Sequence, residues 1–210
     1  MSLKTIRLAT LGVALVSASV VVAACSDSTA QGTGTLQLLL TDAPFSSDSV
    51  SRVDVYVVRV DAKMAETESA ELADGTSDTD AMKNEWTTVA TPNRKIELLA
   101  LRNGITTTLG ESKLAAGAYR SFRFVIDPSQ SSVTLKNGTV LTSSSTPNVS
   151  FPSAARSGIK INLDKPIVIA TDGTTTAVVD FDVNQSFVLR SGTIADGGLI
   201  FKPVIRGTTR

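Results

Sequence analysis

The sequence predicts an all-β protein, an antiparallel β-sandwich that follows an N-terminal signal peptide and a flexible tether. Short β-branched and aromatic runs recur at the spacing of sandwich strands, and Asn-Gly and Asp-Gly pairs stand between some of them. No apolar run after the leader combines the length and the 3.6-residue period of a helix. Together these features favour two packed sheets over a helical core.

The first 25 residues have the pattern of an export leader. Lys4 and Arg7 precede an apolar run over residues 8–24, which ends in the small-residue sequence Val22-Ala23-Ala24-Cys25. This ending resembles the lipobox of bacterial lipoproteins, which implies cleavage before Cys25 and attachment of fatty acids such as palmitate to it. An ordinary secretory leader and a retained membrane anchor are the alternatives.

A polar segment, 25–34, follows the expected signal peptide 1–24 and is typical of a flexible tether. Ser26 stands where inner-membrane lipoproteins of enteric bacteria carry Asp, so the resemblance implies an outer-membrane lipoprotein of the cell envelope. The remaining residues, 35–210, are expected to form the sandwich domain. Two or more acyl chains would hold this domain stably at the membrane.

The first half of the domain is expected to contain five strands. Each combines β-branched, leucine or aromatic residues with flanking turn residues. They are Leu36–Thr41, Val53–Val60, Trp86–Val89, Lys95–Leu101 and Tyr119–Ile126. The acidic segment 63–85 is expected to be a solvated loop, with a cation or partner site as the alternative. Residues 114–117 are expected to form a turn or short helix.

The second half is expected to begin with two hairpins. Asn137-Gly138 joins Ser132–Lys136 to Thr139–Thr142, and this dipeptide favours a type I′ turn. Asp172-Gly173 stands in the same way between Pro166–Ala170 and 175–183. Two further strands, 187–190 and 199–206, are expected to close the domain.

Composition excludes several classes of function. One cysteine and no histidine remove disulfide frameworks, Cys/His zinc sites and histidine-dependent catalytic triads. The chain carries 20 Lys and Arg against 20 Asp and Glu. Such a balance offers no electrostatic footprint for nucleic acid.

The best candidate for a metal site is Asp180-x-Asp182-x-Asn184-x-Ser186. On an extended strand, this alternation would place oxygen ligands on one face, as a hard cation such as Ca²⁺ prefers. An EF-hand is excluded, because Gln185 replaces its glycine. The alternative is a structural role, in which the carboxylates pair with basic side chains or accept from loop backbone. The basic candidates are Lys160, Arg190 and Arg206.

The same carboxylates suggest a second chemistry. Asp180 and Asp182, about 7 Å apart on one strand face, are close enough for glycosidase-type acid and base work. One Trp and two Tyr are too few for an aromatic sugar platform, which argues against this role. Asp42, in the Thr-Asp-Ala-Pro turn, is expected to be an Asx-turn residue and not a catalyst.

Five segments of the chain share one resemblance. They are Leu38–Pro44, Ala116–Phe124, Ser157–Ile161, Val179–Val188 and Lys202–Arg206. These segments resemble the bacterial lipoprotein family known as domain of unknown function 4382. The resemblance implies a secreted, lipid-anchored sandwich related to transthyretin-like or immunoglobulin-like folds, with no established activity. The acidic segment 63–85 lies outside it.

We therefore expect a lipid-anchored module of the cell envelope that binds or supports an unknown envelope protein or ligand, without catalysis or a cofactor. A Ca²⁺-stabilised adhesion domain and a carboxylate-dependent hydrolase are the alternatives. A hydrolase requires a water-lined cleft around Asp180 and Asp182 that also holds a further acid or base.

Overall fold

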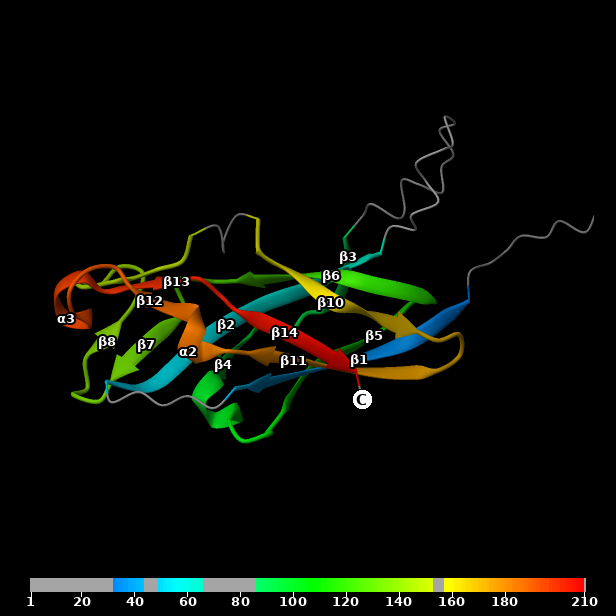
Figure 1. Cartoon of the computed structure of the whole chain (residues 1–210), viewed down its shortest axis with the longest axis horizontal. Helices are drawn as coiled ribbons and strands as arrows, with labels where there is room; N and C mark the ends of the chain where they lie inside the picture. Colours follow the sequence, from blue (N-terminus) through cyan, green and yellow to red (C-terminus); the bar gives the residue numbers. More distant parts are fainter. Residues whose placement is uncertain (1–31, 44–48, 66–85, 153–156, 210) are drawn as a thin grey trace, which may run out of the picture. The chain divides into compact units, whose positions relative to one another are not determined.

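The computed structural model describes residues 32–43, 49–65, 86–152 and 157–209. The expected signal peptide, Cys25, most of the tether and most of the acidic segment lie outside the described residues. Contacts group Gln31–Arg210 into one compact unit. The described residues form an all-β sandwich, as predicted, and Figure 1 shows its strands. The first strand begins at Thr33, inside the segment expected to be tether.

One sheet carries the N-terminal strand at its centre. Its hydrogen-bonded order is β14-β11-β1-β5 in the described chain. β1 runs parallel to β11 and antiparallel to β5. The bounds are β1 Thr33–Asp42, β5 Thr107–Ala115, β11 Thr174–Phe181 and β14 Ile205–Thr209.

The second sheet is organised around one long strand, β2 (Val50–Met64). Its main order is β10-β6-β2-β7-β8, and β3 and β4 also pair with β2. Fifteen residues give β2 the length to pair with four strands at different points. The other bounds are β3 Thr87–Ala90, β4 Arg94–Glu97, β6 Gly117–Ile126, β7 Ser132–Leu135, β8 Val140–Leu141 and β10 Ile159–Ile169.

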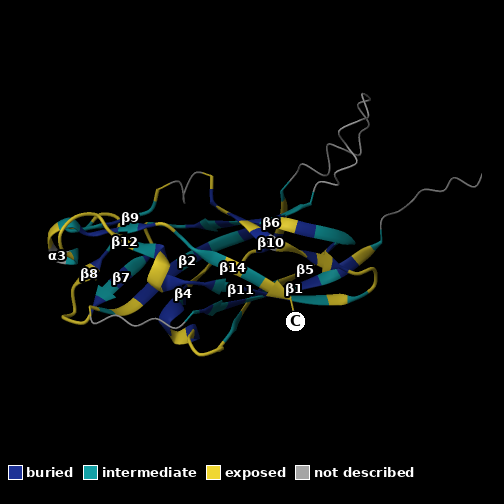
Figure 2. Cartoon of the chain, in the orientation of Figure 1, coloured by how far each residue is buried: buried dark blue, intermediate teal, exposed yellow. Residues whose placement is uncertain are grey.

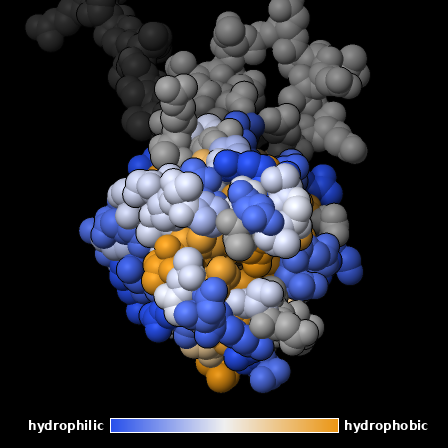
Figure 3. Space-filling view, turned by 90° about the vertical axis from the view of Figure 1, so that its left-hand side faces the viewer, coloured by the Kyte–Doolittle hydropathy of each residue, from blue (hydrophilic) through white to orange (hydrophobic). Residues whose placement is uncertain are grey.

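A small third sheet lies at one end of the sandwich, in the order β12-β13-β9. Two single-turn helices flank it, and a 3₁₀ turn follows β4. Apolar side chains reach the surface at this end, as Figure 3 shows. The bounds are β9 Val149–Ser150, α2 Val183–Ser186, β12 Phe187–Leu189, α3 Ile194–Gly197, β13 Leu199–Phe201 and η2 Leu98–Leu101.

The core lies between the two large sheets, where Figure 2 shows the buried residues concentrated. β1 shows the pattern most clearly: Leu36, Leu38 and Leu40 are each at most 1% exposed, and the residues between them are partly exposed. Full burial of such a side chain contributes about 1.5 to 3 kcal/mol. Phe201 packs against three other phenylalanine rings and joins the small sheet to this core.

The antiparallel expectation holds for most strand pairs but not for all. β1 pairs with β11 in parallel, as β13 does with β9. The predicted hairpin at Asp172-Gly173 is wrong, because β10 and β11 belong to different sheets. The turn itself is present: the Gly173 N–H bonds to Ala170 O, and Asp172 has φ +56°. It therefore carries the chain from one layer to the other.

The Asn137-Gly138 hairpin forms, but its turn differs from the predicted type I′. That type requires positive φ at both central residues, whereas only Gly138, at +87°, has it here. The Gly138 N–H bonds to Leu135 O, so the turn spans residues 135–138. This geometry corresponds to a type I turn followed by a glycine bulge. The Asn137 side chain accepts from the Thr139 N–H and holds the turn in place.

Three local predictions need correction. Residues 98–101 form a 3₁₀ turn and not the end of a strand. The turn buries three leucines, whereas a strand would bury only every second residue. Residues 114–117 do not form the predicted turn or short helix, because Leu114 and Ala115 belong to β5 and β6 begins at Gly117. The predicted strand 199–206 is interrupted at residues 202–204, where Pro203 has no N–H for a ladder.

Candidate functional site

The predicted metal motif changes conformation in its middle. β11 ends at Phe181, and the next residues form α2, so the assumed extended strand does not continue. Phe181 and Val183 are buried, as predicted. The helical turn separates the other two positions, however: Asn184 is exposed and Ser186 is fully buried. The four oxygen-bearing side chains therefore do not share one face.

Asp182 makes several hydrogen bonds at the corner of the sandwich where β11 meets α2. It caps α2, because its Oδ1 accepts from the Gln185 N–H at 3.0 Å and its Oδ2 accepts from Gln185 Nε2 at 2.6 Å. The Ser186 hydroxyl donates to the Asp182 carbonyl at 2.6 Å and accepts from the Val204 N–H. These bonds fasten the link between β11 and β12 to the segment that precedes β14.

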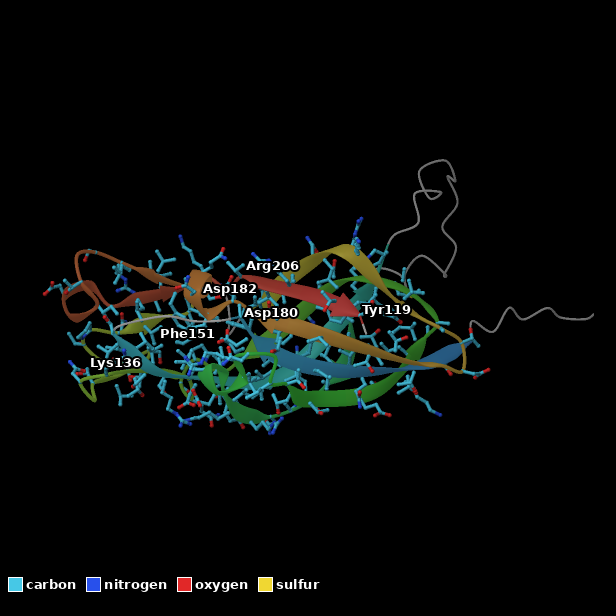
Figure 4. All side chains as sticks on the ribbon, turned by 60° about the horizontal axis from the view of Figure 1, so that its bottom comes forward. Tyr119, Lys136, Phe151, Asp180, Asp182 and Arg206 are labelled. Carbon is cyan, nitrogen blue, oxygen red and sulfur yellow. The ribbon has the colours of Figure 1, made fainter. Side chains whose placement is uncertain are left out.

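Arg206 is the basic partner of this group. Its Nη1 lies 3.8 Å from Asp182 Oδ2, and its backbone pairs with Asp180 across β14 and β11. Figure 4 shows Asp180, Asp182 and Arg206 together where these strands meet. Asp182 thus has both kinds of contact expected of a structural carboxylate, a basic partner in Arg206 and a backbone donor in Gln185.

Asp42 also lies at this corner, in a role that no pattern in the sequence indicates. Asp42 follows Leu40 on the inward face of β1 and is only 3% exposed. Its Oδ1 accepts from the Val183 N–H at 3.2 Å, and its Oδ2 has no hydrogen-bond partner. The expected Asx turn is wrong, because Pro44 has no N–H to donate and the carboxylate instead binds the first turn of α2.

Burial and repulsion from neighbouring carboxylates disfavour the charged forms of Asp42 and Asp180. Loss of solvent raises the pKa of Asp42 to about 7, and the charges of Asp180 and Asp182 add to the effect against the opposing Val183 N–H. Burial likewise raises the pKa of Asp180, with Asp182 adding to it and Arg206 and the Ala43 N–H opposing it. The charge of Arg102 opposes the rise at Asp42, as that of Arg206 does at Asp180.

The strand register keeps Asp42 and Asp180 from facing one another. Asp42 pairs with Phe181 and shares its inward face, whereas Asp180 pairs with Thr41 and points to the other face. Asp182 already uses both carboxylate oxygens as acceptors. Among the described residues, no three Asp, Glu, His or Cys side chains are arranged to hold a metal ion.

A mostly apolar groove at the end of the sandwich is a feature suited to binding that the sequence did not predict. We call it the end groove; its volume is about 420 Å³, within the usual range of ligand sites. Figure 3 looks onto this end and shows the apolar area there. The end groove is lined by Ser49, Val50, Val53, Val133, Val183, Asn184, Phe187, Leu189, Gly192, Thr193, Ile194 and Leu199.

None of these lining residues is charged, and most are aliphatic or aromatic. Leu189 is 49% exposed although it lines the end groove. Two other surface hollows are more polar and lie elsewhere, one near Lys63 and Arg120, the other along β10 and β14. Asp180 and Asp182 line none of these three hollows. The cleft that a carboxylate hydrolase requires is therefore not found in any of them.

The end groove left no sequence signal because its walls come from distant segments. Val50 and Val133 come from the paired strands β2 and β7, whereas Val183 and Leu189 follow β11. Each position looks like an ordinary core residue in its own segment.

Among the residues that the structure describes, no helix is long and apolar enough to cross a membrane.

A comparison with known families identifies the family of this chain. The family model described as Domain of unknown function (DUF4382) matches residues 33–203. No curated protein matches the chain. Because the matched segment covers most of the sequence, including nearly every strand of the sandwich, the protein belongs to the DUF4382 family.

Proposed function

We propose that this protein is a lipid-anchored module of the bacterial cell envelope, held at the outer membrane by acyl chains on Cys25, which binds a partner without catalysis. The N-terminal sequence ending in Val22-Ala23-Ala24-Cys25 supports the anchor. The short polar segment after Cys25 would let the sandwich stand off the lipid surface. The partner is an envelope protein or an apolar ligand, and not nucleic acid.

The end groove carries the binding half of the proposal. Exposed apolar surface costs free energy in water, and a concave patch that keeps such surface in a folded domain is typical of an interaction site. Leu189 stands at this patch with half of its surface exposed. The neutral lining favours an apolar partner, because a charged group would lose its hydration there without gaining a counter-charge.

A noncatalytic role agrees with how the described carboxylates are used. Asp182 caps a helix and binds Arg206, while Asp42 accepts from the backbone at the start of the same helix. The end groove itself contains no acid, base or cysteine among its lining residues. General acid–base catalysis needs such groups within reach of a substrate, and a hydroxyl nucleophile such as Ser49 or Thr193 needs an adjacent base to activate it.

Site-specific photocrosslinking in living cells tests the proposal. A photoreactive phenylalanine analogue would replace Leu189, which lines the end groove, and in a matched strain Val168, which is 59% exposed on β10. We expect a discrete crosslinked product from position 189 and little from 168. Equal yields from the two positions, or no product from 189, would contradict binding at the end groove.

A further inference from the structure

One strand beside the end groove has an open edge. β12 is the outer strand of the sheet β12-β13-β9, so no strand of the described chain pairs with its other side. We propose that β12 receives an extended peptide segment of a partner protein, which adds to the sheet as a new strand and covers the end groove. This inference rests on the proposed function and names the class of partner.

The hydrogen-bond pattern identifies which backbone groups are available. The Lys202 N–H donates to Ser186 O at 2.7 Å, and the Arg190 N–H donates to Gly198 O at 3.2 Å. In an antiparallel pair, hydrogen-bonded and non-hydrogen-bonded positions alternate. Val188 therefore bonds to β13, whereas the N–H and C=O of Leu189 point away from it.

The neighbouring strand confirms this alternation. Leu199 is the partner of Leu189 on β13, and its N–H donates to Asn148 O, on the side of β9. The residues opposite Leu189 thus direct their backbone groups away from β12. Leu189 consequently offers one donor and one acceptor at the open edge, which is the pair that an added strand requires.

The side chains at this edge define what the peptide must carry. Phe187 and Leu189 point to the same face of β12 and line the end groove together with Leu199. An added strand would place every second side chain over this face. Because the lining is apolar and uncharged, those side chains should be apolar, with a size close to that of valine or leucine.

The opposite face of the small sheet favours acidic residues at the remaining positions. Val188 and Ile200 form a pair on that face, and by alternation Arg190 and Lys202 lie on the same side. Both basic residues are exposed. A peptide that alternates apolar and acidic residues would therefore match the groove on one face and place its acidic side chains on the same face as Arg190, with Lys202 one strand further in.

The probe is a fluorescent peptide of sequence Glu-Val-Glu-Val-Glu-Val, and binding is measured by anisotropy with the full-length protein in lipid nanodiscs. There are two matched control peptides, one methylated on the valine amides and the other on the glutamate amides. Each loses the backbone donors along one edge of the strand and keeps all of its side chains. We expect one methylated version to bind at least tenfold more weakly. We also expect Leu189→Pro, which removes the open-edge N–H, to weaken binding at least tenfold, and Val168→Asp to leave it unchanged.

Each other outcome has a definite meaning. If both methylated peptides bind as tightly as the parent, or if no peptide binds, strand addition is wrong, and crosslinking from position 189 decides separately whether the proposed function stands. Concentration-dependent dimers that Leu189→Pro abolishes would make a second copy the occupant and overturn the proposal. The methylated peptides keep the test valid should Leu189→Pro fail to fold.

Discussion

Asp61 on β2 and Arg123 on β6 form an ion pair across adjacent strands, with Arg123 Nη2 2.6 Å from Asp61 Oδ2. Asp61 is only 1% exposed, and Arg59 and Thr88 also donate to it. The Arg123 guanidinium in turn lies 4.7 Å from the ring centre of Trp86. On the outer face of the second sheet, the buried carboxylate of Asp61 therefore accepts from three side chains and links β2 to β3 and β6.

Replacing Arg123 with Met should lower the free energy of unfolding by roughly 3 kcal/mol, because it removes one partner of a buried ion pair. The matched control is Arg206→Met. Arg206 lies 3.8 Å from Asp182 and its side chain is 62% exposed, so about 1 kcal/mol or less is expected. Urea unfolding measures both. Equal losses would mean that Asp61 does not depend on Arg123.

Asp42→Asn should stabilise the protein above neutral pH. The pKa of Asp42 in the folded state, about 7, exceeds its ordinary value of 3.8, so the stability contributed by this carboxyl is present below about pH 4 and lost as pH rises through 7. Asparagine removes that loss. At pH 8 the gain should approach about 4 kcal/mol at most, since one pKa unit corresponds to about 1.4 kcal/mol.

The check is urea unfolding of wild type and Asp42→Asn at pH 4 and pH 8. The contrasting variant is Asp127→Asn. Hydrogen bonds from Gln130 and Ser129 lower the pKa of Asp127, so its contribution is present above the unfolded pKa and lost as pH falls. Asp127→Asn should therefore not stabilise at pH 8. A stability difference for Asp42→Asn that is the same at both pH values would refute the shifted pKa.

Two glycines should differ in what alanine costs. A Cβ on Gly34 would collide with the carbonyl oxygen of Ala170, so Gly34→Ala should cost about 2 to 3 kcal/mol through displaced backbone. A Cβ on Gly138 meets nothing within 4 Å, and only its φ of +87° is unfavourable. Gly138→Ala should cost about 1 kcal/mol. Denaturation midpoints of the two variants decide; the reverse order would be inconsistent with this packing of β1.

Cys25→Ser should abolish labelling with a clickable palmitate analogue and release the protein from the membrane fraction. The reason is chemical, since serine has no thiol to receive diacylglycerol. Leu189→Asp serves as the control and should keep both label and membrane association. The anchor assignment fails if the serine variant still partitions with membranes to the same extent as the wild type.

Strands with an uninterrupted period of two were predictable from sequence. β1 buries alternate residues along its length, and β6 does so from Phe122 to Ile126. β2 was predictable from its β-branched run, although it buries three consecutive residues at 53–55 and again at 60–62. β5 was missed because its buried Leu109 and Leu114 are five residues apart, an odd spacing. The register shift opposite Leu38 and Leu39 absorbs one residue of β5 and lets both leucines face the core.

The candidate site was less predictable, since it depends on contacts between distant strands. The link between Asp182 and a basic residue was foreseeable from local charge, but the parallel pairing that brings Asp42 to Val183 was not. The end groove combines β2, β7 and the segment after β11, and no local pattern marks its members. Short-range periodicity predicts faces of strands; it does not tell which faces meet.

Hydrogen exchange at two adjacent amides tests the central claim most directly. In the full-length protein, the Val188 amide should exchange slowly because it bonds to β13, and the Leu189 amide quickly because it faces the open edge. Addition of the alternating valine and glutamate peptide should slow Leu189 at least tenfold and leave Val188 unchanged. Slow exchange at Leu189 without peptide, or no change when the peptide is bound, would contradict an open binding edge beside the end groove.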